Sequence, residues 1–117
     1  EEKTGSMKNT PFGIVGLETS LPLTYTELVE KGVITLKQMV EKMCLNPAKI
    51  LGLESGTLQE GHPADVIIVD TEQEYTIDKN KFVSKGHNTP FDGWKVKGKV
   101  LYTICDGKII FENQEEK

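Results

Sequence analysis

The residues that most often carry chemistry are few in this sequence and widely spaced. His62 and His87 are the only histidines, and no His-x-His or His-x-x-x-His pair exists that could hold a metal ion. Asp65 and Asp70 flank one apolar run, and residues five apart on a strand point to opposite faces. We therefore interpret His62 as an exposed turn residue and His87 as a residue without a functional role. Asp65 is interpreted as a side chain that accepts backbone N–H bonds in the turn before its strand.

Nucleophilic catalysis has no clear candidate either. The sequence contains no Gly-x-Ser-x-Gly motif, no phosphate-binding glycine pattern and no grouping that suggests a catalytic triad. Cys44 and Cys105 are far apart in apolar surroundings, with no histidine beside either one. They are predicted to be buried, reduced side chains, with a disulfide or a catalytic thiol as the alternative. Motifs alone therefore indicate no complete active site.

One short segment, Pro11-Phe12-Gly13, is unusual in another way. Proline fixes one backbone angle, and glycine leaves its peptide uncovered. Such a segment can offer rigid N–H and C=O groups to a ring that has amide edges. The alternative is ordinary packing of a strand-to-helix connection.

Composition limits the classes of function. The chain has 117 residues, of which 37% are hydrophobic and 27% charged, which suits one compact globular domain. The net charge of −4 gives no electrostatic reason to expect nucleic acid or an anionic membrane as a partner. No apolar run approaches the roughly 20 residues that a membrane-spanning helix needs.

Two helices are predicted to follow the Pro11-Phe12-Gly13 segment. Thr24-x-x-Glu27 is a possible capping box for the first helix, and Gly32 is placed to end it. Thr35-x-x-Gln38 repeats the capping signature for the second helix. In this second helix, apolar side chains fall on one face and are predicted to pack in the core: Leu36, Met39, Val40 and Met43.

A third helix and several strands complete the expected elements. Asn46-Pro47 predicts a short helix with Asn46 as its N-cap, and Gly52 ends it. Residues 65–70 form a β-branched run that predicts a strand buried on both faces. A shorter strand is expected at residues 75–77, and residues 79–98 are predicted to lack regular structure.

The end of the chain predicts a hairpin. Residues 100–105 and 108–111 are rich in β-forming side chains, and Asp106-Gly107 between them is typical of a type I′ turn. With so few strands, the sequence predicts an α+β fragment whose sheet is not closed.

The motifs, in their order and spacing, resemble the C-terminal part of the dihydroorotases, members of the amidohydrolase superfamily, and of the longer bacterial type in particular. Residues 11–19, Pro-Phe-Gly-Ile-Val-Gly-Leu-Glu-Thr, favour dihydroorotase itself. The Asn-Pro-Ala of residues 46–48 and the Ala-Asp of residues 64–65 are shared with hydantoinases and allantoinases. Further matching elements are Ser84-Lys85, Asn88-Thr89-Pro90-Phe91, Gly98 and Asp106-Gly107-Lys108.

The resemblance implies a fold in two parts. Residues 1–53 would form an active-site loop and the last helices of a (β/α)8 TIM barrel. Residues 54–117 would form the C-terminal strands of the flanking amidohydrolase β-sandwich. The stretch Glu1 to Thr10 would lie beside the active site and could act as a lid.

The resemblance also implies a reaction and the residues that serve it. The intact enzyme would cyclise N-carbamoyl-aspartate reversibly to dihydroorotate in pyrimidine biosynthesis, with two zinc ions as cofactors. Phe12 and Gly13 would contact the dihydroorotate ring through their main chain. The metal ligands and catalytic residues would lie upstream of this chain. The fragment alone is therefore expected to bind no zinc, to be inactive and, through its uncovered surfaces, to self-associate.

Other functions remain open at this point. The chain could belong to an allantoinase or hydantoinase, or to a non-catalytic dihydroorotase-like scaffold for aspartate transcarbamoylase. A free-standing binding module is a further alternative. The resemblance implies a small-molecule substrate, a cytoplasmic location and a homo-oligomer, with aspartate transcarbamoylase as a candidate partner.

Overall fold

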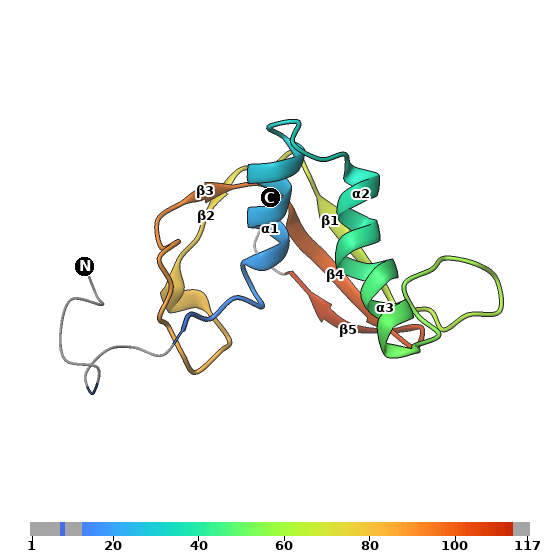
Figure 1. Ribbon diagram of the computed structural model, residues 1–117. Coiled ribbons are helices and arrows are strands. Elements are labelled where there is room, and N and C mark those ends of the chain that lie inside the picture. Colours follow the sequence, from blue (N-terminus) through green and yellow to red (C-terminus); the bar gives the residue numbers. More distant parts are fainter. Residues whose placement is uncertain (1–7, 9–12, 114–117) are drawn as a thin grey trace.

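The computed structural model of the chain describes residue 8 and residues 13–113. Helices come first along the chain and strands follow, which confirms the α+β class (Figure 1). The elements are α1 (Ser20–Thr24), η2 (Tyr25–Val29), α2 (Leu36–Val40), η3 (Glu41–Leu45), α3 (Asn46–Leu51), β1 (Val66–Asp70), β2 (Tyr75–Thr76), η4 (Lys79–Lys81), β3 (Lys95–Val96), β4 (Lys99–Cys105) and β5 (Lys108–Glu112).

The first helix begins earlier than its sequence predicts. α1 starts at Ser20 and continues into the π-helical turn η2, so Thr24 lies inside the helix, where its hydroxyl donates to Ser20 O at 2.7 Å. The predicted capping box at Thr24 is therefore wrong. Pro22 fits inside the first turn because that turn needs no intrahelical N–H there. Gly32 follows the helix in the left-handed conformation, as predicted, with a φ of 69°.

The second and third helices are one continuous helix. The capping box of Thr35 and Gln38 is present as predicted, but Asn46 lies inside the helix and is no N-cap. Pro47 has no N–H to donate to the preceding turn. It is tolerated because the wider π turn η3, which ends with Asn46 N donating to Glu41 O, comes directly before it. Gly52 ends the helix at a φ of 66°.

The face of this helix that was expected to be buried is largely open. Met39 is 6% exposed, whereas Leu36, Val40 and Met43 are 37% exposed or more. The helix lies along one side of the main sheet (Figure 1), and no other described element covers the rest of its apolar face. Hydrophobic spacing predicts an apolar face but does not say what covers it.

The main sheet has three antiparallel strands in the order β1-β4-β5. The Asp106-Gly107 hairpin between β4 and β5 is confirmed, with both residues at positive φ, 48° and 74°. β1 was expected to be buried on both faces, but Ile67 and Ile68 are 44% and 46% exposed. This expectation was wrong because these neighbouring residues point to opposite faces of the sheet, and the described elements cover neither face fully.

A second, two-stranded ribbon pairs β2 with β3. β3 was not predicted, because residues 79–98 were expected to lack regular structure. The most buried apolar side chains of the described residues are Val96 of β3, at 1% exposure, and Ile77, directly after β2, at 4%. The ribbon joins the first helix through Thr26, whose hydroxyl accepts from Lys97 N at 2.9 Å.

No helix among the described residues is long and apolar enough to cross a membrane.

Candidate functional site

Gly13 is the predicted site residue that the structure describes, whereas Phe12 lies outside the described residues. Gly13 is exposed and has a φ of 65°, a backbone angle that residues other than glycine rarely adopt. A Cβ added to it would meet nothing within 4 Å. Conformation and not crowding therefore explains a glycine here, and the space where a side chain would stand is open.

The main chain around Gly13 is held by Asn88, 75 residues away. The Asn88 side-chain amide donates to Gly13 O, and Asn88 O accepts from Val15 N at 3.0 Å. The two segments approach so closely that a Cβ added at Gly86 would stand 2.9 Å from Val15 Cγ1. We call residues 78–93, which leave β2 and return to β3, the excursion. The excursion thus supports the Gly13 segment.

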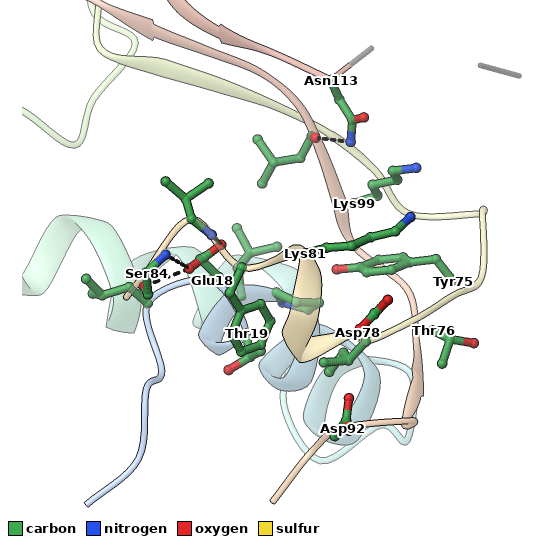
Figure 2. Close-up of a pocket in the computed structure, with 18 of the residues that line it drawn as sticks. Glu18, Thr19, Tyr75, Thr76, Asp78, Lys81, Ser84, Asp92, Lys99 and Asn113 are labelled. Carbon is green, nitrogen blue, oxygen red and sulfur yellow. Dashed lines mark hydrogen bonds between the residues drawn. The ribbon is translucent and has the colours of Figure 1, made fainter. Parts of the chain in front are cut away.

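Glu18 makes a second link between the same two parts of the chain. Its carboxylate accepts from Val83 N at 3.0 Å, from Ser84 N at 3.1 Å and from Ser84 Oγ at 2.8 Å (Figure 2). Burial raises the pKa of Glu18, but these three hydrogen bonds and the nearby His87 outweigh it, so the pKa lies below its ordinary value of 4.5. The charged form of Glu18 is therefore the form that holds the excursion.

We expect Glu18 to stabilise the fold in a pH-dependent way. A folded-state pKa below the unfolded value contributes stability above pH 4.5, and that stability is lost as the pH falls through the folded pKa. Glu18→Gln should therefore lower the Tm at pH 7, and the difference from the unchanged protein should shrink steadily below pH 4.5. Glu60→Gln, on an exposed loop before β1, is the control. A Tm difference that stays constant from pH 7 to acid would contradict this role.

A groove of about 1250 Å³ opens between the start of α1, the excursion and strands β4 and β5. Figure 2 shows its polar side chains, several of which accept hydrogen bonds from backbone N–H groups of nearby turns. Asp92 accepts from Lys79 N at 3.1 Å, which lowers the pKa of Asp92, and Asp78 accepts from Asn80 N at 2.9 Å. These carboxylates therefore stabilise the excursion and are not arranged as a pair for acid–base catalysis.

The other residues considered from the sequence are scattered. His62 is an exposed turn residue, as predicted, and His87 Nδ1 lies 2.5 Å from Lys79 O. Asp65 accepts from Asp106 N at 2.9 Å, so it does bond a turn, but that turn is the β4–β5 hairpin and not its own.

Both cysteines are free, and the prediction that they are buried is wrong because each is exposed. The Asp65 carboxylate is the main cause that raises the pKa of the Cys105 thiol, and this favours the unreactive protonated form. The structure therefore gives no support to Cys105 as a nucleophile.

A metal centre does not fit the described residues. Among residue 8 and residues 13–113, no group of three or more His, Cys, Asp or Glu side chains could hold a metal ion. Zinc ligands would have to come from outside this part of the chain.

Two functional candidates escaped the residue-by-residue reading of the sequence, namely Asn88 and Glu18. Both stand inside segments that carry the family resemblance, which was the only signal available. Their roles depend on partners 65 to 75 residues away, so no local spacing could have shown them.

Comparisons with known proteins agree with the resemblance. The model of the amidohydrolase family matches residues 3–110. The chain is 51% identical over 114 residues to a dihydroorotase of Bacillus cereus strain B4264, covering 97% of this chain and 27% of that relative. It is 50% identical over 114 residues to a dihydroorotase of Bacillus thuringiensis strain Al Hakam, with the same coverage.

Solved structures of hydantoinases share the fold. L-hydantoinase from Arthrobacter aurescens matches with a TM-score of 0.85 and 38% identity, covering 94% of this chain and 25% of its own. D-hydantoinase from Bacillus sp. AR9 matches with a TM-score of 0.78 and 27% identity, covering 94% of this chain and 25% of its own.

These matches cover nearly all of this chain but only a small part of each relative. The chain spans about a quarter of the length of the curated relatives it matches, 27% in each of the two dihydroorotases. The family model, in contrast, matches almost all of the chain. The chain therefore belongs to the amidohydrolase family, and within it the sequence is similar to the dihydroorotases, as its motifs predicted.

Proposed function

We propose that this chain is the C-terminal part of a dihydroorotase. In this proposal the intact enzyme cyclises N-carbamoyl-aspartate reversibly to dihydroorotate in pyrimidine biosynthesis. The observation that carries the proposal is the 51% identity to a named dihydroorotase over 114 of the 117 residues. Identity at this level over nearly the whole chain supports a shared activity more strongly than a shared fold does.

The proposal gives each half of the chain a place in a larger fold. Residues 1–53 would supply an active-site loop and the closing helices of a (β/α)8 barrel, and residues 54–117 the last strands of the flanking β-sandwich. The uncovered apolar side chains support this assignment, because β5 exposes Ile109, Ile110 and Phe111 by 46% to 65%. A strand face of this kind is normally covered by further strands or helices.

The residues of this chain would bind and orient the substrate. Dihydroorotate is a six-membered ring whose edge alternates amide N–H and C=O groups, and a peptide main chain is complementary to such an edge. Phe12 and Gly13 would make that contact. The exposed peptide and left-handed backbone of Gly13 support this role, because no side chain of its own covers the peptide.

Zinc belongs to the proposal only for the intact enzyme, because the described residues do not provide a metal site. The chain by itself is expected to turn over no dihydroorotate. A cytoplasmic location and a homo-oligomer, with aspartate transcarbamoylase as a candidate partner, complete the proposal.

A hydantoinase or allantoinase is the second candidate. The observation that favours it is the L-hydantoinase of Arthrobacter aurescens, with 38% identity and a TM-score of 0.85. Hydantoin is also a cyclic amide, so the main chain at Gly13 would serve that ring in the same way.

Substrate selectivity separates the two candidates. The full-length protein that contains this chain should be assayed with zinc on dihydroorotate, hydantoin and allantoin, and again after removal of the metal by a chelator. Metal-dependent turnover of dihydroorotate alone would support the first candidate. Turnover of hydantoin or allantoin without dihydroorotate would support the second, and no turnover of any ring would indicate a non-catalytic relative.

A further inference from the structure

We propose that Asn88 is a positioning residue that fixes the Gly13 peptide in the conformation presented to dihydroorotate. This inference rests on the proposed function, because it assigns a task to a residue that does not itself touch the ring. Asn88 would keep rigid the main-chain contact between Gly13 and the ring.

The first step is that Gly13 needs an external constraint. Glycine has the greatest backbone freedom of all residues, so a glycine peptide on an exposed segment does not keep one orientation by itself. Gly13 is exposed, and nothing surrounds the position of a Cβ. A hydrogen bond to Gly13 O restricts the rotation of the peptide that follows Gly13.

The second step is that Asn88 supplies this constraint from two of its groups. Its side-chain amide donates to Gly13 O, and its main-chain O accepts from Val15 N at 3.0 Å. One residue therefore holds both ends of a three-residue segment. Only the first of these bonds depends on the asparagine side chain, so a substitution can remove it and leave the second in place.

The third step is that Asn88 itself stands on a fixed support. The excursion that carries it is closed at its base by Ile77 N to Trp94 O at 2.9 Å and Gly93 N to Ile77 O at 2.8 Å. The Glu18 carboxylate holds it again at Val83 and Ser84. A main-chain contact to substrate gains affinity when the contact is rigid before binding, and this network provides that rigidity.

The test compares two alanine variants in the full-length, zinc-loaded enzyme. Asn88→Ala removes the bond to Gly13 O. Asn80→Ala is the matched control, because Asn80 lies on the same excursion and, among the described residues, its side-chain amide bonds within its own turn, to Asp78 at 3.0 Å. We expect Asn88→Ala to raise KM for dihydroorotate about fivefold to tenfold, the size of one lost hydrogen bond, with kcat nearly unchanged. Asn80→Ala should leave both constants as they are.

A third variant separates positioning from a merely structural role. In Asn88→Asp, the carboxylate cannot donate to Gly13 O, whereas the protonated acid can. The KM defect of Asn88→Asp relative to the unchanged enzyme should therefore shrink as the pH falls toward about 4, the usual carboxyl range. The defect of Asn88→Ala should not change with pH in this way.

The outcomes distinguish this inference from the proposed function. Turnover of dihydroorotate with equal KM in Asn88→Ala and Asn80→Ala would overturn the positioning role and leave the function standing. A similar loss of kcat and Tm in both variants would also overturn it, because the excursion would then serve stability alone. If the unchanged enzyme does not turn over dihydroorotate, both proposals fall together.

Discussion

Valine in place of Gly13 is expected to lower kcat/KM for dihydroorotate at least tenfold in the full-length enzyme. Gly13 has a φ of 65°, and a β-branched residue in this left-handed region costs about 1–2 kcal/mol. The chain can avoid that cost by rotating the Gly13 peptide, which would break its bond to Asn88 and remove the main-chain contact that we propose for the ring. If the peptide stays in place, the added side chain occupies the open space beside Gly13, where we propose that the ring binds.

Gly32→Val is the matched control for this experiment. Gly32 has nearly the same φ, 69°, and a Cβ added there also meets nothing within 4 Å. Both variants should therefore lose a comparable amount of stability in urea unfolding, because both carry the same backbone strain. Only Gly13→Val should lose kcat/KM. Equal losses of kcat/KM in the two variants, or no loss in Gly13→Val, would contradict the proposal that Gly13 contacts the substrate.

The elements that could be predicted from the sequence are those whose signals lie within a few residues. The capping box of Thr35 and Gln38 and the Asp106-Gly107 hairpin were both predicted and are present. Each depends on a bond or a backbone angle between near neighbours, so the local sequence contains its cause. Gly32 and Gly52 end their helices for the same reason.

The predictions that were wrong concern burial and the continuity of elements. Asn46 was expected to begin a helix, but the π turn before Pro47 lets the helix continue. The faces of β1 and of the second helix were expected to be buried, yet Ile67 and Val40 are 44% and 49% exposed. Burial depends on which other elements cover a face, and apolar spacing carries no such information.

The candidate site could be predicted only in part. The glycine at position 13 was singled out by its residue type and by the family resemblance. Asn88 and Glu18 were not, because an asparagine on an irregular stretch and a glutamate before a helix have no local feature that marks them. Their importance arises when the excursion folds back onto residues 13–18, a contact that a single sequence does not reveal.

The contact between the first helix and Gly98, just before β4, is expected to be sensitive to substitution. Gly98 is buried and has a φ of 90°. A Cβ added there would stand 3.3 Å from Tyr25 Cβ, 3.4 Å from Leu21 Cδ2 and 3.4 Å from Pro22 Cα. Only the contact with Tyr25 Cβ is closer than an ordinary van der Waals contact, and a Cβ is fixed to its own backbone, so this contact is relieved only if the helix shifts by a few tenths of an ångström.

Movement of the helix would break the bonds that tie it to the ribbon. Lys97 N donates to Thr26 Oγ1 at 2.9 Å, and Lys97 Nζ donates to Glu30 Oε1 at 2.7 Å. Gly98→Ala therefore combines backbone strain with overpacking at one site, and we expect it to lower the free energy of unfolding by about 2–4 kcal/mol.

Gly61→Ala separates these two causes. Gly61 has almost the same φ, 88°, but a Cβ added there meets nothing within 4 Å. It should therefore show the strain alone, about 1 kcal/mol. Urea unfolding midpoints of the two variants, compared at equal m-values, give the difference. Gly98 differs from Gly61 in its burial and its contacts but not in its backbone angle. Equal losses would therefore mean that the helix is not tightly packed against Gly98.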